Sequence, residues 1–304
     1  MVLSNFDELV KAVQGFHKKR VVAIASAEDE AIIEAGLCAY HEDIARPIFI
    51  GNAAIIREIM AEKTDRVSDF EIVDAPREKT GQYAVDMVKS GEADILMKGL
   101  MESRDFLGPI VKKENGLRTG NIMSHVAFFE LPNYHKLLMA TDGGMVMYPT
   151  LEEKRHIIDN ATLALRAMGY ECPEHAVVCA IEFVNPKMTE TVEAAELARM
   201  NEQGIIKNCV VVGPISYDVA MRTDIARHKG YDSPHCGDFD CLIMPNMQAG
   251  NILGKSFIVT ACAPMAGVIM GAKAPAVMTS RGSSAEEKFN SIAMGALIAF
   301  GLGE

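Results

Sequence analysis

The residue types best suited to chemistry gather near the end of the chain, in the segment Ala274–Lys288. An apolar run there leads into a hydroxyl at Ser280, a cation at Arg281 and a glycine at Gly282, and helical spacing follows. Free backbone N–H groups at a helix start, together with an arginine side chain, suit a phosphate group. The pattern therefore indicates an anion site, and the alternative is a surface arginine beside a well-capped final helix.

The same segment carries two possible signals for the start of this helix. Ser283 with Glu286, or Ser284 with Glu287, has the spacing of a capping box, in which serine and glutamate side chains bond each other's backbone N–H groups. One of the two glutamates could cap the helix and leave the other free to face a ligand.

A second candidate segment is Met244–Lys255. Gly250 and Gly254 permit close approach of a ligand or of another part of the backbone. Asn246 and Asn251 offer both hydrogen-bond donors and acceptors. Taken alone this is a weak signal, because asparagine and glycine are common loop residues.

The elements that must position these residues follow an alternating pattern. Short apolar runs rich in valine and isoleucine predict strands buried on both faces, and longer segments with helical spacing separate them. The runs are Val21–Ala25, Pro47–Ile50, Phe70–Val73, Ala93–Met97, Ala176–Phe183, Cys209–Val212, Cys241–Met244 and Ala276–Thr279, and the helical segments include Asp29–Tyr40, Gly81–Lys89, Leu151–Met168 and Thr189–Met200. This alternation predicts an α/β fold with mostly parallel sheets.

Several predicted strands end in polar or glycine-rich residues. In open parallel sheets, ligands bind beyond the carboxyl ends of the strands. Turn formation explains most of these glycines, prolines and asparagines, but it does not explain the cations Lys98 and Arg281. Both stand where an anion could bind at the start of a following helix.

The middle of the chain has a different pattern. Segments Ile122–Leu131 and Lys136–Thr141 flank Pro132-Asn133-Tyr134, which predicts an antiparallel pair of strands. We place a domain boundary shortly after this pair, between Thr141 and Pro149. Two domains fit the 304 residues, since one domain usually takes about 100–200.

Composition narrows the possible partners. The net charge of −11 disfavours nucleic acid and anionic membranes as ligands, since both require a basic surface. Small anionic ligands remain possible, because they bind at local sites. The apolar stretch Ser256–Ala272 is interrupted by Pro264 and is too short for a membrane span, so we interpret it as core.

The cysteines favour a reducing compartment. Their number is seven, which is odd, and the acidic N-terminal segment does not resemble a secretory signal, so we expect a cytoplasmic protein. The cluster His235–Cys241 could suggest a metal site, but its cysteine spacing is not C-x-x-C and no second pair accompanies it. A polar loop before a strand is the better interpretation.

Together these segments resemble the phosphate acetyltransferase and phosphate butyryltransferase family over most of the chain. Ser280-Arg281-Gly282 followed by an acidic residue is similar to the family's C-terminal signature, and the motif from Pro245 to Lys255 is similar to its second signature. Four further segments resemble the butyryl branch: Ala93–Leu100, Gly116–Gly120, Val184–Met188 and Val212–Pro214. Each is weak alone, but their joint occurrence in the family's order is specific.

The resemblance implies a subunit of two α/β/α domains, of the isocitrate or isopropylmalate dehydrogenase type, with the active site in the interdomain cleft. Residues 1–143 and 271–304 would form the first domain and residues 144–270 the second. The implied reaction is reversible transfer of an acyl group between acyl-CoA and inorganic phosphate. Coenzyme A is a substrate, no metal or redox cofactor is expected, and a homodimer or larger homo-oligomer is implied.

The resemblance also assigns roles to residues. The family's base is an aspartate seven positions after its serine, and Glu287 stands at that spacing from Ser280. Arg281 would hold the phosphoryl oxygens, and Ser280 would bond the sulfur or the carbonyl oxygen. Gly108 stands where many relatives carry a basic residue, for which Arg104 or Arg118 is the candidate replacement. The expected substrate-binding residues are Lys98, Ser103, Arg104, Arg118, Asn246, Gly250, Asn251 and Lys255.

Three alternatives stay open at this point. A phosphate acetyltransferase would share every motif, because the acyl pocket is built from scattered apolar residues. A non-catalytic sensor of acyl-CoA or phosphate could use the same fold. A dehydrogenase of the isocitrate type would need clustered aspartates and a dinucleotide site, and we find neither a cluster nor a G-x-G-x-x-G after a strand.

Overall fold

The computed structural model describes residues 2–280 and 282–303, and these form two compact units. Unit 1 comprises Met1–Ser4 and Ile122–Pro264, and unit 2 comprises Asn5–Asn121 and Met265–Glu304. These limits differ from the expected domains, 1–143 with 271–304 and 144–270. The difference has a physical reason: the antiparallel pair at residues 124–141 bonds to a later strand of unit 1 and so belongs there.

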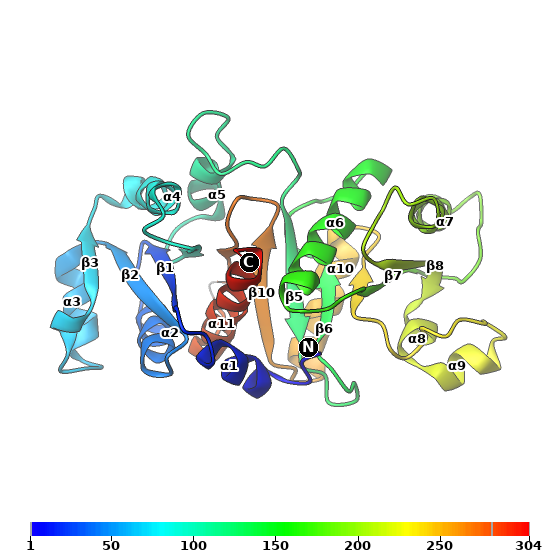
Figure 1. Cartoon of the computed structure of the whole chain (residues 1–304), viewed down its shortest axis with the longest axis horizontal. Coiled ribbons are helices and arrows are strands. Elements are labelled where there is room, and N and C mark those ends of the chain that lie inside the picture. Colours follow the sequence, from blue (N-terminus) through cyan, green and yellow to red (C-terminus); the bar gives the residue numbers. More distant parts are fainter. Residues whose placement is uncertain (1, 281, 304) are drawn as a thin grey trace. The chain divides into compact units, whose positions relative to one another are not determined.

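Unit 2 is built on a mostly parallel sheet (Figure 1). Its strands are β1 Arg20–Ala25, β2 Ala45–Gly51, β3 Glu71–Asp74, β4 Ile95–Lys98, β10 Met265–Met270 and β11 Ala276–Val277. Their order is β3-β2-β1-β4-β11-β10, and only β10 pairs antiparallel to its neighbour β11. The predicted apolar runs supply β1, β2, β3, β4 and β11.

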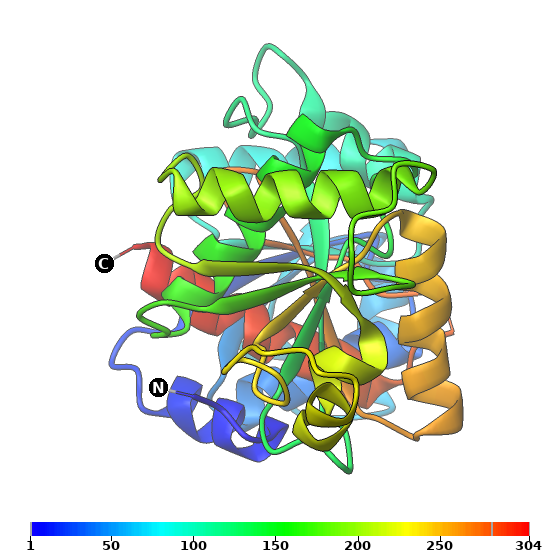
Figure 2. The same cartoon turned by 90° about the vertical axis from the view of Figure 1, so that its right-hand side faces the viewer.

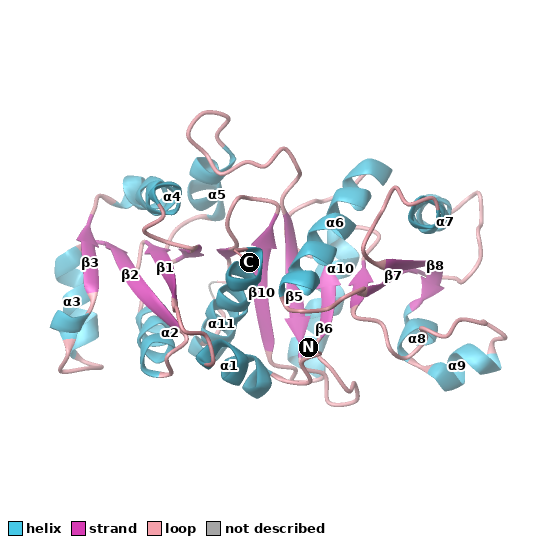
Figure 3. Cartoon of the chain, viewed as in Figure 1, coloured by secondary structure: helices cyan, strands magenta, loops and turns pink. Residues whose placement is uncertain are grey.

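Helices cover both faces of this sheet (Figure 3). They are α1 Phe6–Gln14, α2 Glu30–His41, α3 Ala53–Ala61, α4 Thr80–Ser90, α5 Ser103–Val111 and α11 Ala285–Leu302, with two short 3-10 turns at Val67–Asp69 and Arg77–Lys79. Helix α2 packs against α3 and α11, whereas α4 packs against α5 and against β1 and β4 from the other face. Strand β2 follows β1 on one side and β4 lies on its other side, so the strand order reverses between β1 and β4. Ligands of open α/β sheets bind at such a reversal.

Unit 1 is also built on a mostly parallel sheet. Its strands are β5 Ser124–Phe129, β6 Leu138–Thr141, β7 Glu174–Cys179, β8 Val210–Ser216 and β9 Cys241–Ile243, in the order β5-β6-β9-β7-β8. The predicted antiparallel pair is confirmed as β5 and β6, and the other pairings are parallel. The order reverses between β7 and β9, which places a second switch point in this unit.

The helices of unit 1 are α6 Leu151–Ala167, α7 Thr189–Glu202, α8 Tyr217–Met221, α9 Thr223–His228 and α10 Met247–Thr260. Figure 2 shows the yellow-green α7 above the strands of this unit and α8 and α9 below them. Each unit is therefore an α/β/α sandwich, which confirms the predicted fold class.

The apolar stretch Ser256–Ala272 is divided between the end of α10 and strand β10. Pro264 lies between the two elements, and its carbonyl accepts a hydrogen bond from the backbone of Glu130. Strand β10 is largely buried, as expected of core. No helix in the described part of the chain has both the length and the apolar character needed to cross a bilayer.

Candidate active site

The switch point of unit 2 is built from two loops in tight backbone contact, one after β1 and one after β4. The backbone N–H of Gly99 donates to the carbonyl of Ala25 at 2.8 Å, and that of Leu100 donates to Ser26 at 2.7 Å. A Cβ atom on Gly99 would lie 2.1 Å from the Ser26 carbonyl oxygen, so only glycine fits. Ser26 itself has a φ of 55° and its Oγ lies 2.8 Å from Thr80 Oγ1. The edge where β1 and β4 end is therefore firmly defined.

Lys98, the last residue of β4, lies at this edge but points into the loop. Its side chain is 6% exposed, and its Nζ donates to the Met101 carbonyl at 3.0 Å and to the Gly99 carbonyl at 3.4 Å. Its charge is thus positioned beneath the loop rather than in open solvent. The predicted role in substrate binding stays a prediction.

Arg77 is a cation at this edge that the sequence motifs did not indicate. It belongs to the 3-10 turn after β3, and its guanidinium donates to the Leu100 carbonyl at 2.8 Å. Arg77 is exposed. No local signal identified it, because its place beside the β4 loop depends on how distant strands pair.

Ser103 and Arg104 begin helix α5, and both are exposed. Gly108 lies in the same helix, and a Cβ there would meet nothing within 4 Å, so a longer side chain has room. Arg118 is exposed on a loop whose neighbour Leu117 is 1% exposed.

That loop is fastened to the connection between β10 and β11. Arg118 forms a β-bridge with Ala272, and Thr119 Oγ1 donates to the Gly271 carbonyl at 2.7 Å. The backbone N–H of Lys273 donates to the Leu117 carbonyl at 2.8 Å. Residues 117–119 are thereby joined to the segment that leads into the C-terminal signature.

The signature turn, which the structure describes at residues 280 and 282–284, lies between β11 and α11 in the chain. Ser280 is exposed, and its carbonyl accepts from the backbone N–H of Ser283 at 3.1 Å. Arg281, to which the family resemblance assigns the phosphoryl contact, lies outside the described residues. Ser284 is the N-cap of α11, and its Oγ accepts from the backbone N–H of Glu287 at 3.1 Å. The sequence allowed a cap by Ser283 with Glu286 or by Ser284 with Glu287. The structure contains the hydrogen bond from the Glu287 backbone to the Ser284 side chain.

Both glutamates lie in the first turn of α11, but their exposure differs. Glu286 is exposed and Glu287 is half-buried. The cap uses the backbone of Glu287, so its carboxylate does not form that hydrogen bond. This arrangement suits the predicted role of Glu287 as a base, which stays a prediction.

Lys288 is buried directly behind the signature turn. Its side chain is 4% exposed, and its Nζ donates a hydrogen bond to the Ser283 carbonyl. Burial lowers the pKa of Lys288, and the negative charges of Asp29 and Glu287 act in the opposite direction. Asp29 is the N-cap of α2, so the starts of α2 and α11 converge near this ammonium group.

In unit 1, the second signature begins helix α10 directly after β9. Asn246 is the N-cap, and its Oδ1 accepts from the backbone N–H of Ala249 at 3.0 Å. The Asn251 side-chain amide donates to the Gly143 carbonyl at 3.0 Å. Lys255 is exposed one turn further along α10 and shares a face with Asn251. The side chains of Asn246 and Asn251 thus have structural partners as well as a predicted role in binding.

Gly250 is required by the loop after β6. A Cβ on Gly250 would lie 2.5 Å from the Asp142 carbonyl oxygen and 3.0 Å from the Cα of Gly143. The predicted close approach at Gly250 is therefore made by another part of the backbone. Of the two possibilities that the sequence left open there, the structure shows this one.

The loop after β6 is organised by a buried carboxylate that none of the sequence motifs indicated. Asp142 is 2% exposed, and its Oδ1 accepts from the backbone N–H groups of Gly144 at 2.7 Å and Met145 at 3.0 Å. Its Oδ2 accepts from Val146 at 3.1 Å. Desolvation lowers the pKa of the half-buried His125, and the Asp142 carboxylate opposes this shift. The signal available in the sequence was Thr141-Asp142-Gly143-Gly144 at the end of a strand.

The segment His235–Cys241, which could have suggested a metal site, forms ion pairs with Lys136. The carboxylate of Asp240 bonds Lys136 Nζ at 2.6 Å, and Asp238 lies 2.9 Å from the same atom. The other oxygen of Asp240 accepts from the backbone N–H of Glu174 at 2.8 Å. Strand β9 follows at Cys241, which confirms the interpretation as a polar loop before a strand.

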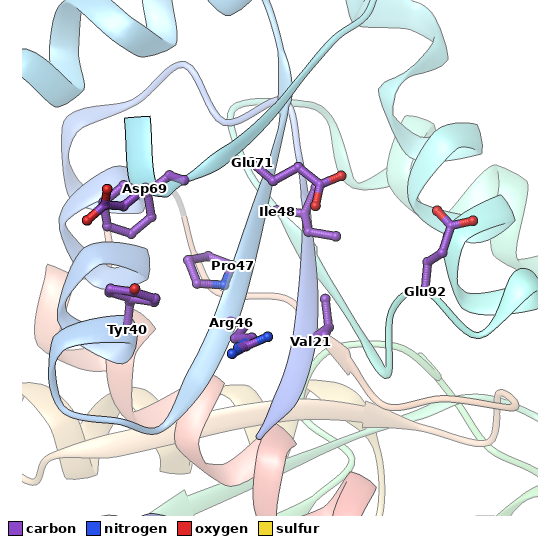
Figure 4. A pocket seen from close by; sticks show the side chains of 9 residues that line it. Val21, Tyr40, Arg46, Pro47, Ile48, Asp69, Glu71 and Glu92 are labelled. Atoms are coloured by element: carbon purple, nitrogen blue, oxygen red, sulfur yellow. The ribbon is translucent and has the colours of Figure 1, made fainter. Parts of the chain in front are cut away.

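A separate pocket of about 450 Å³ lies where β1, β2 and β3 begin, away from the ends of the strands that carry the signatures (Figure 4). It is lined by Val21, Tyr40, Arg46, Pro47, Ile48, Asp69, Phe70, Glu71 and Glu92. None of the predicted site residues lines it.

Comparison with known proteins decides the family. The family model "Phosphate acetyl/butaryl transferase" matches residues 65–296. The chain belongs to this phosphate acetyl/butyryl transferase family. Its curated relatives include a phosphate butyryltransferase of Clostridium acetobutylicum, 41% identical over 98% of this chain and 99% of the relative. A phosphate acetyltransferase of Thermotoga maritima is also 41% identical, over 96% of this chain and 99% of the relative.

Solved structures agree with the family assignment. A branched-chain phosphotransacylase from Enterococcus faecalis V583 has a TM-score of 0.81 and 32% identity, covering 92% of this chain and 99% of its own. A 4-hydroxythreonine-4-phosphate dehydrogenase from Klebsiella pneumoniae, at 14% identity and a TM-score of 0.58, shares the fold alone. The chain therefore shares the fold of a dehydrogenase although its sequence has no G-x-G-x-x-G motif after a strand.

Proposed function

We propose that this protein is a phosphate acyltransferase that transfers a short acyl group reversibly between coenzyme A and inorganic phosphate, with butyryl as the favoured group. The observation that carries the proposal is the signature turn. It follows a strand close to the switch point of unit 2, begins a capped helix, and occurs in a chain 41% identical to a phosphate butyryltransferase over nearly its whole length.

In the direction that forms acyl phosphate, a phosphate oxygen attacks the carbonyl carbon of the thioester. A C–O bond forms, the C–S bond breaks, and CoA leaves as a thiolate. The N–H groups at the start of α11, with Arg281, would hold the phosphate and offset the growing negative charge. Ser280 would donate to the sulfur or to the carbonyl oxygen.

In the reverse direction, the thiol of CoA must lose its proton before it attacks acyl phosphate, because the thiolate is the nucleophile. Glu287 would accept this proton, since the residue is half-buried in the first turn of α11 and its carboxylate does not form the cap hydrogen bond. The remaining predicted residues would bind substrate: Lys98, Ser103, Arg104 and Arg118 in unit 2, and Asn246, Gly250, Asn251 and Lys255 in unit 1.

The preference for butyryl over acetyl rests on the four segments that resemble the butyryl branch. The relatives at 41% identity include both a butyryl and an acetyl enzyme, so overall identity does not separate the two. Release of CoA should be measured with phosphate and acyl-CoA substrates of C2 to C5. We expect a higher kcat/KM for butyryl-CoA, and a clear preference for acetyl-CoA would favour the phosphate acetyltransferase alternative.

We further infer that the transfer uses no metal or redox cofactor, as the family resemblance implies. A cytoplasmic location is supported by the cysteines, all seven of which are free thiols. A homodimer or larger homo-oligomer is supported by α10, on which Ile252 is 70% and Val259 75% exposed. These two residues are seven positions apart and lie on one face of the helix, as expected of a surface that a second copy covers.

A further inference from the structure

Lys288 differs from two of the other buried lysines in the described part of the chain, Lys136 and Lys154. Lys136 and Lys154 each bond a carboxylate, Asp240 at 2.6 Å and Glu193 at 2.5 Å respectively. Lys288 is as buried as Lys154, at 4% exposure, but it forms no ion pair with any residue that the structure describes. Its hydrogen bond goes to a neutral carbonyl, that of Ser283.

The positive charge of Lys288 is in an unfavourable electrostatic environment when no ligand is bound. The start of a helix carries partial positive charge, and the ammonium group lies at the start of α11, close to the start of α2. The carboxylates of Asp29 and Glu287 act on it by charge but do not bond it directly. Positive charge in this place is favourable when an anion binds at the signature turn.

We propose that Lys288 is a positioning residue for the phosphate group of the substrate. Its hydrogen bond to the Ser283 carbonyl holds the signature turn from behind, so that the N–H groups at the start of α11 face the ligand. Its charge, to which no carboxylate of the described residues is directly bonded, adds to the attraction for the anion. This inference rests on the proposed function and deepens it, because no sequence motif assigned a role to Lys288.

Lys288→Met tests the inference, since methionine fills a similar volume without charge or donor. We expect the KM for phosphate to rise about tenfold, the scale of effect that a charge at a helix N-terminus produces. The KM for butyryl-CoA should change by less than about twofold, because Lys288 holds the turn that is proposed to bind inorganic phosphate. As a readout besides activity, inorganic phosphate should raise the melting temperature of the wild-type protein more than that of the variant.

Lys154→Met is the matched control. It removes an equally buried lysine from unit 1, where Lys154 joins α6 to α7. We expect it to lower the melting temperature while leaving the KM for phosphate unchanged. If Lys288→Met is not recovered as folded protein, Lys288→Gln replaces it, because glutamine keeps a donor and loses the charge, and a smaller rise in the KM for phosphate is expected.

Two results would overturn the inference. One is an unchanged KM for phosphate in a folded Lys288 variant, and the other is an equal rise in the KM values for phosphate and butyryl-CoA, which loosened packing would cause. If the wild-type protein itself shows no phosphate-dependent release of CoA, the proposed function fails instead. The wild-type assay thus separates the two failures.

Discussion

Gly250 and Gly143 meet backbone to backbone, so that a Cβ added to Gly250 would lie 3.0 Å from the Cα of Gly143. The contact joins the first turn of α10 to the loop that the Asp142 carboxylate organises. The second signature thus needs glycine for packing, and Asn251 strengthens the same contact through the Gly143 carbonyl.

Gly250→Ala should destabilise unit 1 by about 1–3 kcal/mol, the usual cost of adding a methyl group to a closely packed site. Gly108→Ala is the control, because a Cβ there meets nothing within 4 Å and should be neutral or stabilising by about 0.4–1 kcal/mol. Urea unfolding of both variants measures the difference. Equal stability of the two variants would show that the backbone contact at Gly250 tolerates a methyl group.

Glu287→Gln should slow the attack of CoA on acyl phosphate by roughly 10²–10⁴-fold, as loss of a general base does. The loss should shrink at high pH, where CoA ionises without help. The melting temperature should stay near that of the wild type, because the cap uses the backbone N–H of Glu287. The measurement is a pH–rate profile together with a melting curve.

Two further variants serve as controls for Glu287. Glu286→Gln should have little effect on rate, since this side chain is exposed in the same turn. Ser284→Ala should lose the cap and about 0.5–2 kcal/mol of stability. A Glu287→Gln enzyme with a normal profile at neutral pH would end the general-base assignment.

His175 should make the protein less stable in acid. It is fully buried, its Nε2 lies 2.8 Å from Thr162 Oγ1, and desolvation lowers its pKa to about 3. Because the folded-state pKa lies below the unfolded value of about 6.5, the unfolded chain binds the extra proton between these values and stability falls as pH falls. Between pH 7.5 and 5.5 this residue should remove roughly 1 kcal/mol from the free energy of unfolding.

Urea unfolding of the wild type and of His175→Gln at both pH values checks this prediction. The variant is expected to be less stable overall, since a buried side chain is replaced, but its stability should depend less on pH. The same pH dependence in both proteins would contradict the lowered pKa.

Ile252→Glu combined with Val259→Glu should dissociate the proposed oligomer, because two charges would be buried at the interface between copies. The molar mass measured by light scattering should fall to that of the 33.1 kDa chain. Leu163→Glu, at a residue of α6 that is 46% exposed, should leave the assembly intact. A monomeric wild-type protein would refute the role of this face.

The sequence was sufficient to predict much of the fold, and the reason is visible in particular strands. Strands β1, β2 and β4 are buried on both faces, so continuous apolar runs mark them within a few residues. Helix α10 was harder to predict from the sequence. Gly250 and Gly254 weaken its helical pattern, and the apolar run at its end continues into β10. Only Pro264 marked the change of element.

The candidate site was predictable where it is local in sequence. The spacing of Ser284 and Glu287 predicted a cap that the structure contains. Lys288 and Arg77 could not be found in this way. The burial of Lys288 depends on packing against α2, and the place of Arg77 depends on the pairing of β1 with β4, so both are set by contacts distant in the chain.

The most direct test of the account is the identity of the product formed from butyryl-CoA and phosphate. Phosphorus NMR of the reaction, with released thiol measured in parallel, should show one butyryl phosphate for each CoA released and no release without phosphate. Release of thiol without acyl phosphate would mean thioester hydrolysis, and binding of butyryl-CoA with neither product would mean a sensor. Either result would contradict acyl transfer to phosphate.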